Sequence, residues 1–238
     1  MARRPTGRST GGNGKPQLPM PTKSNREKIV ETFMALLAEH RFERIGFGEI
    51  AARCGLSLAD CRNEFASTIG ILAAHVKEVD RNVLAGGQGD MAEEPPRERL
   101  FDVLMRRLET LAPQRAAIRS LMRSAARNPG LAFALNGFAV RSQQWMLTAA
   151  DIDAAGPRGL IRAQGLALLY ARVLRVWLND DDPGLARTLA ALDRELARGQ
   201  RWANFLDDVC RFAPRCRRRR RRDSRRDSRY GDEEPAAA

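Results

Sequence analysis

The chain of 238 residues has few of the residues that build β-sheets. It contains two tyrosines, aromatic residues make up only 6% of it, and no segment alternates apolar and polar positions between turn signals as a strand does. Leu and Ala dominate instead, and both favour helices. These absences exclude a β-sandwich or a β-barrel, and we expect an all-α fold.

Cysteine is scarce as well, with Cys54, Cys61, Cys210 and Cys216 as the four occurrences. Four cysteines in a chain of this length do not form a disulfide framework. Cys54 and Cys61 lie too far apart for a C-x-x-C motif and have no histidine at ligand spacing, which excludes the usual zinc patterns. We therefore expect buried or free thiols, no metal or other cofactor, and a reducing cytoplasm.

Catalytic and membrane signatures are also missing. His40 and His75 have no carboxylate or cysteine constellation around them, and we place both on helix surfaces. The chain has neither a catalytic dyad nor a glycine-rich phosphate loop, so we do not expect an enzyme. The N-terminus is charged without an apolar core segment, and apolar stretches such as 131–140 are too short for a membrane span. These features predict a soluble cytoplasmic protein.

Positive charge is present in excess, and it is concentrated at the two ends. Residues 1–25 carry five basic side chains and no acid, while residues 211–238 carry eleven arginines against five acids. Of the net charge of +12, residues 26–210 hold only +1. The pI near 10.8 therefore describes two segments, 1–23 and 211–238, whose composition predicts disorder, attached to a nearly neutral globule.

The first ordered part has the layout of a helix-turn-helix. Ser24 and Glu27 form a capping box at the start of one helix, and Ser57 and Asp60 form another. Between them, residues 47–54 predict a short helix that Gly55 ends in a left-handed conformation. Three helices within 24–70 therefore predict a module whose last helix can enter the major groove of DNA.

Six further helices are expected in residues 71–210. The fourth helix begins after Ser67 and ends at the glycine-rich break at 86–89, and prolines mark the later helix starts at Pro95-Pro96, Pro113, Pro129, Pro157 and Pro183. The last two helices carry more apolar residues than one core-facing stripe requires. This surplus favours self-association, and we expect a homodimer that forms through these two helices.

The chain resembles the TetR family of bacterial transcriptional regulators. Residues 50–57 read Ile-Ala-Ala-Arg-Cys-Gly-Leu-Ser, similar to the family's I-A-x-x-A-G-V-S, and Phe65 and Ser67 fall at its F-x-S. The resemblance covers roughly 26–210 and implies a nine-helix fold with two domains. These are a DNA-binding domain at 24–70 and a helical regulatory and dimerisation domain at 71–210.

The resemblance also implies a DNA-contacting surface, but the contact positions depart from the family pattern. The candidate contact residues are Ser57, Leu58, Ala59, Asp60, Arg62, Asn63, Ser67 and Thr68. Asp60, Arg62 and Thr68 replace the family's phosphate donors, and residues 26–70 carry a net charge of −1. Because phosphate contacts supply much of the affinity for DNA, these changes predict weakened binding. Leu58, Arg62 and Asn63 are the expected base readers, with Asn63 suited to adenine and Arg62 to guanine or phosphate.

Two functions fit these observations. The first is a homodimeric DNA-binding regulator that uses its basic N-terminal arm for extra contacts and responds to a small apolar ligand. Candidate pocket residues are Phe101, Met105, Trp145, Tyr170 and Trp177, although such aromatic residues are also typical of a plain core. The second is a carrier of lipid or of a hydrophobic metabolite without specific DNA binding, because residues 168–178 also resemble the TetR-fold lipid-binding protein of ubiquinone biosynthesis. In a third hypothesis, the arginine tail docks the globule on anionic lipid or RNA.

Overall fold

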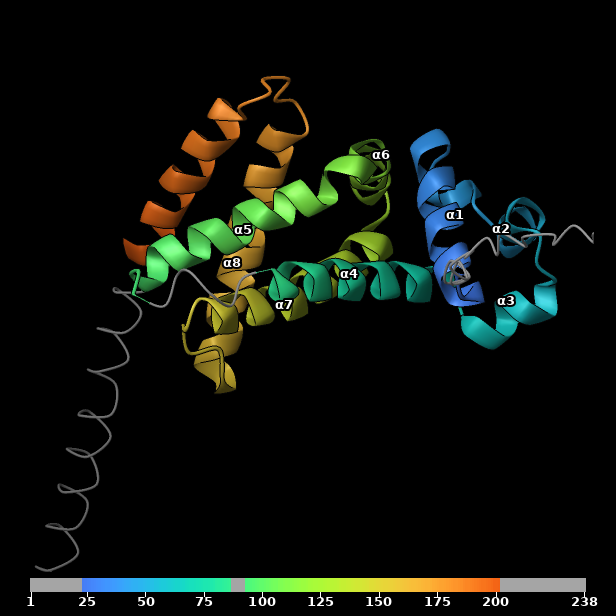
Figure 1. The fold of residues 1–238 in the computed structure, drawn as a ribbon, viewed down its shortest axis with the longest axis horizontal. Helices are drawn as coiled ribbons and strands as arrows, with labels where there is room; N and C mark the ends of the chain where they lie inside the picture. Colours follow the sequence, from blue (N-terminus) through green and yellow to red (C-terminus); the bar gives the residue numbers. More distant parts are fainter. Residues whose placement is uncertain (1–22, 87–92, 202–238) are drawn as a thin grey trace, which may run out of the picture.

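The computed structural model describes residues 23–86 and 93–201, which form helices and no strand (Figure 1). The helices are α1 (Asn25–Glu39), α2 (Phe47–Cys54), α3 (Leu58–Glu64), α4 (Thr68–Ala85), α5 (Pro96–Leu111), α6 (Arg115–Ala125), α7 (Pro129–Ala149) and α8 (Gly156–Trp177). Two short 3₁₀ turns, η1 (Phe42–Arg44) and η2 (Ala112–Gln114), precede α2 and α6. Residues 186–201 form a ninth helical segment that reaches the end of the described range. The predicted all-α fold is confirmed.

Some expectations concern residues outside this range. They include the arm up to residue 22, the glycines at 87–89 and the Arg-rich tail. The part of the last predicted helix beyond residue 201, with Cys210, and Cys216 in the tail also lie outside the described residues.

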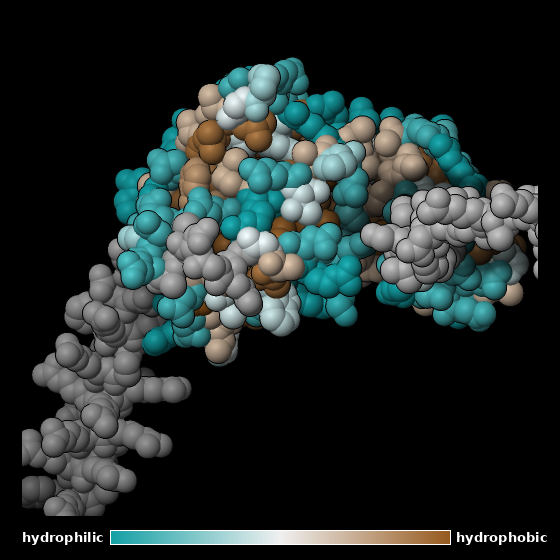
Figure 2. Space-filling model, in the orientation of Figure 1, coloured by the Kyte–Doolittle hydropathy of each residue, from teal (hydrophilic) through white to brown (hydrophobic). Residues whose placement is uncertain are grey.

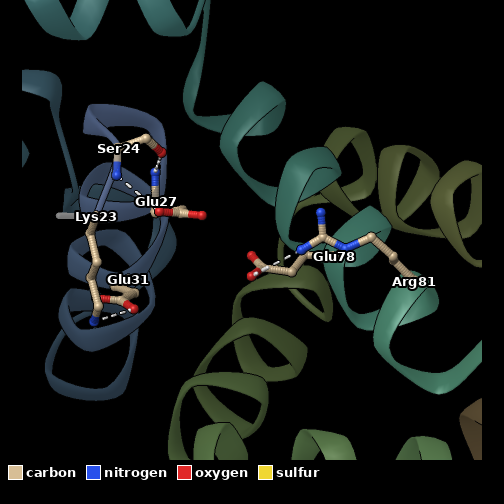
Figure 3. Close-up of polar contacts among 6 residues, drawn as sticks. All are labelled: Lys23, Ser24, Glu27, Glu31, Glu78 and Arg81. Atoms are coloured by element: carbon tan, nitrogen blue, oxygen red, sulfur yellow. Dashed lines mark hydrogen bonds and ion pairs between the residues drawn. The ribbon is translucent and has the colours of Figure 1, made fainter. Parts of the chain in front are cut away.

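Local hydrogen bonds explain why the first helices begin where they do. Figure 3 shows Ser24 and Glu27 at the start of α1, where the Glu27 amide donates to Ser24 Oγ at 3.3 Å and the Ser24 amide donates to Glu27 Oε2 at 2.9 Å. In the same view Lys23 Nζ lies 2.7 Å from Glu31 Oε1 on the next turns of α1. Both predicted capping boxes are present, and Gly55 ends α2 with φ 68°, the left-handed conformation that glycine adopts without strain.

Helices α1 to α3 share one apolar core with the start of α4 and with parts of α6 and α7. We call α1 to α3 the N-terminal module. Its buried side chains include Phe33 from α1, Ile50 from α2 and Cys61 from α3, and Ala117 and Leu131 join them from α6 and α7. The module is therefore packed against the rest of the chain through α6, whose Ser120 Oγ donates to the His40 carbonyl at 2.8 Å.

A second core lies among α4, α5, α7, α8 and residues 186–201, which we call the C-terminal body. Its fully buried residues include Leu104, Met146, Val173 and Trp177. The two cores separate within α4, since Leu72 belongs to the first and Val79 to the second. One continuous helix therefore connects the N-terminal module to the C-terminal body. Within the described residues, every helix is too short or too polar to cross a bilayer.

Three sequence expectations need correction. His75 was expected on a helix surface, but it is buried, with 7% of its surface exposed. The sixth helix was expected to begin at Pro113, but Pro113 lies in the 3₁₀ turn and α6 begins at Arg115. The ninth helix was expected to begin at Pro183, but its helical segment begins at residue 186. His75 lies four residues from both Ile71 and Val79, so helical periodicity places it within the buried stripe of α4, and the surface assignment arose from the polarity of the residue alone.

Candidate nucleic-acid interface

Helix α3 is held against α1 so that one side of it faces outward. Its Cys61 is fully buried, and Phe65 at its C-terminal cap is nearly so. Arg26 of α1 secures the end of the helix, because its Nη1 donates to the Glu64 carbonyl at 3.3 Å and its guanidinium lies 4.4 Å from the centre of the Phe65 ring. Sequence reasoning missed this role of Arg26, because the two residues are 38 positions apart and no local pattern connects them.

None of the eight candidate DNA-contacting residues is buried. The exposed ones are Ser57, Leu58, Ala59, Arg62, Asn63 and Ser67, while Asp60 and Thr68 are half-buried. Leu58 is notable because 59% of this large apolar side chain is exposed. An apolar side chain on the outer face of a recognition helix suits contact with a thymine methyl group.

Asp60 is the acid that stands where a phosphate donor was expected, and its carboxylate is turned back onto the helix start. Its Oδ2 accepts hydrogen bonds from Ser57 Oγ at 2.6 Å and from the Ser57 amide at 3.1 Å. The bond from the Ser57 hydroxyl is the main cause that lowers the pKa of Asp60, and the bond from the Ser57 amide adds to it. The negative charge therefore stabilises the first turn of α3, where a helix favours an anion.

Arg62 and Asn63 are the polar side chains of α3 that remain available. Neither makes a side-chain hydrogen bond or ion pair with any residue in the part of the chain that the structure describes. Arg53, by contrast, is bound to Glu39 through two contacts of 2.5 and 2.6 Å, which raise the pKa of Arg53 and lower that of Glu39. The structure thus leaves Arg62 and Asn63 free to bind a partner on the exposed side of α3.

Ser67 and Thr68 lie at the start of α4, beside the end of α3. Ser67 Oγ accepts a hydrogen bond from the Gly70 amide at 3.1 Å and caps the helix. The Ser67 hydroxyl retains its own proton for donation, since a hydroxyl can accept and donate at once. Together with the N-terminus of α4, Ser67 is suited to an anion such as a backbone phosphate.

The C-terminal body contains a buried group of polar side chains in its apolar core. Arg107 of α5 forms an ion pair with Asp80 of α4, and Ser142 Oγ of α7 donates to the same carboxylate oxygen at 2.7 Å. The guanidinium lies 5.8 Å from the centre of the Tyr170 ring of α8, and burial raises the pKa of the Tyr170 hydroxyl. We call Asp80, Arg107, Ser142 and Tyr170, together with His75, whose pKa the Arg107 charge lowers, the buried polar cluster.

Four of the five candidate pocket residues lie in this core. Tyr170 and Trp177 are buried members of the core, and Phe101 and Met105 are partly exposed and pack against this core. Trp145 is separate, since 56% of its surface is exposed on α7. The structure brings the other four candidates together in one core and leaves Trp145 on the surface of the protomer.

Because His75 is buried, we expect the free energy of unfolding to decrease in acid. Burial, with a smaller contribution from the Arg107 charge, lowers the pKa of His75 to about 4 from 6.5. As the pH falls below 6.5, the unfolded chain binds a proton at this residue while the folded chain does not, so the free energy of unfolding decreases until about pH 4. The shift corresponds to about 3 kcal/mol. Equilibrium urea unfolding between pH 7 and pH 4 should therefore show a smaller loss for His75→Leu than for the wild type, by about this amount.

The other histidine supplies the control. His40 has an exposed side chain beside Glu49, so His40→Leu should retain the acid-dependent loss of the wild type. Equal pH slopes for His75→Leu and the wild type would show that His75 takes up its proton in the folded chain as readily as in the unfolded one.

The fold and the geometry of α3 can be compared with known proteins. No protein-family model matches the chain, and no curated protein sequence matches it either. Among solved structures, the chain is similar to a TetR transcriptional regulator from Nitrosomonas europaea, with 23% identity and a TM-score of 0.60 over 75% of this chain and 99% of that one. It is also similar to TetR regulators from Rhodococcus sp. RHA1, with 21% identity and a TM-score of 0.53 over 72% and 93% of the two chains, and from Streptomyces coelicolor, with 14% identity and a TM-score of 0.53 over 80% and 86%. The protein therefore has the fold of the TetR-type transcriptional regulators.

Proposed function

We propose that the protein is a homodimeric transcriptional regulator that reads DNA with α3. The observation that carries this proposal is the exposed face of α3, on which Leu58, Arg62 and Asn63 are directed away from the core and have no partner among the described residues. An unpaired arginine and asparagine on a supported helix are the side chains that read guanine and adenine in the major groove. In a two-fold dimer the two copies of α3 would read half-sites about 34–36 Å apart.

An apolar surface supports the dimer. Leu160, Ile161 and Leu168 are exposed on α8, and Leu189 is partly exposed on the adjacent helical segment. Figure 2 shows apolar residues at the surface in the upper left part of the view, where Figure 1 places α8 and residues 186–201. Exposed apolar surface of this kind commonly marks an association site.

The ligand site of this regulator would lie in the C-terminal body. The buried polar cluster lies in the second apolar core, and its His75 Nε2 is buried without a hydrogen-bond partner among the described residues. Because unpaired buried polar atoms are costly, a molecule that supplies hydrogen bonds there would gain affinity. We infer a small, mainly apolar ligand with one polar end. It would act on DNA binding through α4, which extends from this cluster to the end of α3.

Two substitutions on α3 test the DNA-binding proposal. The duplex sequence that the full-length protein prefers is first selected from a random library, and affinities for it and for an unrelated duplex are then measured over a range of salt concentrations. Arg62→Ala and Asn63→Ala should each weaken binding to the selected duplex by about 1–3 kcal/mol, because each removes a base contact. Binding to the unrelated duplex should change little, since phosphate contacts dominate it.

Arg141→Ala is the matched control, since it removes one exposed arginine from α7 and should affect both duplexes equally. The proposal fails if the wild type prefers no sequence or if the ratio of the two affinities is the same in all variants. The alternative of a lipid or metabolite carrier would then gain support from an apolar molecule that copurifies with the protein and is identified by mass spectrometry.

A further inference from the structure

A basic hollow lies at the junction between the N-terminal module and α6. It has a volume of about 390 Å³, within the usual range for small-molecule sites. Its walls come from η1 with the residue before it, from the end of α6 and from the start of α7. The lining residues are Arg41, Glu43, Arg44, Arg123, Ser124, Arg127, Asn128 and Pro129.

Four of these side chains are arginines, and one is acidic. Arg44, Arg123 and Arg127 form no side-chain hydrogen bond or ion pair with any described residue. Arg53 and Arg107, by contrast, have close carboxylate partners. Guanidinium groups that share a hollow without counter-charges repel one another, and a bound anion would remove that cost.

Glu43 neutralises only one of the four positive charges in the hollow. Its pKa is lowered mainly by a hydrogen bond from the backbone amide of Glu43 itself, with smaller contributions from Ser124, Asn128 and the Arg41 charge. The carboxylate is thus held by groups at the wall. Four guanidiniums against one carboxylate leave an excess of three positive charges.

We propose that this hollow binds a phosphate-type anion. Arginine presents a planar fork of donors that matches the oxygens of a phosphate, and several such forks can bind one group together. The N-terminus of α7, a helix of 21 residues, borders the hollow at Asn128 and Pro129 and adds a favourable dipole. The anion is either a free phosphorylated small molecule or a phosphate of the DNA backbone.

An anion in the hollow would affect the N-terminal module, because the hollow lies between this module and α6. Arg41 and Arg44 belong to the connection between α1 and α2, while Arg123 and Arg127 belong to the end of α6 and the turn after it. The Phe42 amide donates to Ser124 Oγ at 3.3 Å in the same junction. A multivalent anion would therefore add contacts to both sides of this junction and hold the N-terminal module against α6.

The test compares two double variants of the full-length protein. Arg123→Ala/Arg127→Ala removes two guanidiniums from the hollow, and Arg141→Ala/Arg194→Ala removes two exposed arginines elsewhere, so the net charges match. Inorganic pyrophosphate is titrated into each protein by calorimetry, and the preferred and unrelated duplexes are titrated over a range of salt concentrations. The basic ends of the chain are the same in both proteins and contribute equally.

If the anion is a free phosphorylated ligand, pyrophosphate should bind at least tenfold more weakly to Arg123→Ala/Arg127→Ala, and its binding to Arg141→Ala/Arg194→Ala should be unchanged. If the anion is a phosphate of the DNA backbone, one or two phosphate contacts are lost in Arg123→Ala/Arg127→Ala alone. The slope of log affinity for DNA against log salt concentration should then decrease in magnitude by about 1–2. Equal behaviour of the two double variants with both probes overturns the proposal. The pyrophosphate result does not depend on sequence-specific DNA binding, so failure of the proposed function is distinguishable from failure of the anion site.

Discussion

Arg107→Met is expected to lower the free energy of unfolding by about 3–5 kcal/mol, because it leaves the carboxylate of Asp80 buried without its counter-charge. Both residues are more than nine-tenths buried, and Ser142 offers Asp80 only one neutral donor. Chemical denaturation with urea at neutral pH measures the change.

Two further variants make this prediction specific to the buried pair. Arg53→Met breaks the exposed ion pair with Glu39 and should have little effect, because solvent-exposed pairs contribute little to stability. Asp80→Asn/Arg107→Met removes both charges and should be more stable than Arg107→Met alone. If Arg107→Met is no more destabilising than Arg53→Met, water reaches the Asp80 carboxylate and the pair is not a structural requirement.

In the proposed regulator, the pair would take part in coupling between the two cores. Asp80 is on α4, and the same helix contributes Leu72 to the core of the N-terminal module. A ligand that competes for Arg107 would weaken the hold of α5 on α4. A displacement of α4 would reach α3 directly, because only Phe65, Ala66 and Ser67 separate the two helices.

Local features of the fold could be predicted from the sequence because their causes are local. A capping box needs only residues three apart, and the left-handed turn at Gly55 needs only one glycine. Long-range partners could not be predicted in this way. Asp80 lies on the flank of the apolar stripe of α4, and its buried charge is paired with that of Arg107, which lies 27 residues beyond it.

The candidate site likewise combines features that the sequence predicts with long-range features that it does not. Counting charges over 26–70 predicts a surface poor in phosphate donors, but a count does not show where each charge is directed. The structure shows that the charged Asp60 carboxylate caps its own helix and that Arg53 offsets the charge of Glu39. The basic hollow was missed because its two pairs of arginines are about eighty positions apart and meet only when α6 packs against α1.

Charged substitutions on the apolar surface of α8 are expected to have a large effect on assembly and on DNA binding. Ile161 and Leu168 are 57% and 52% exposed and lie seven residues apart, on one face of the helix. In the double variant Ile161→Glu/Leu168→Glu, four carboxylates would be buried at a two-fold interface, so we expect monomers in sedimentation velocity. A monomer binds one half-site, and loss of the linked second site should weaken binding to the preferred duplex by about 10²–10⁴-fold.

Leu58→Glu is the control for assembly, because it places a carboxylate on a similarly exposed leucine of α3 and should leave the dimer intact. It separates a general effect of surface charge from an effect of the α8 face. If Ile161→Glu/Leu168→Glu stays dimeric, the protomers associate through another surface. If it is monomeric but binds the preferred duplex as tightly as the wild type does, each α3 reads its site alone, and the dimer is not part of DNA recognition.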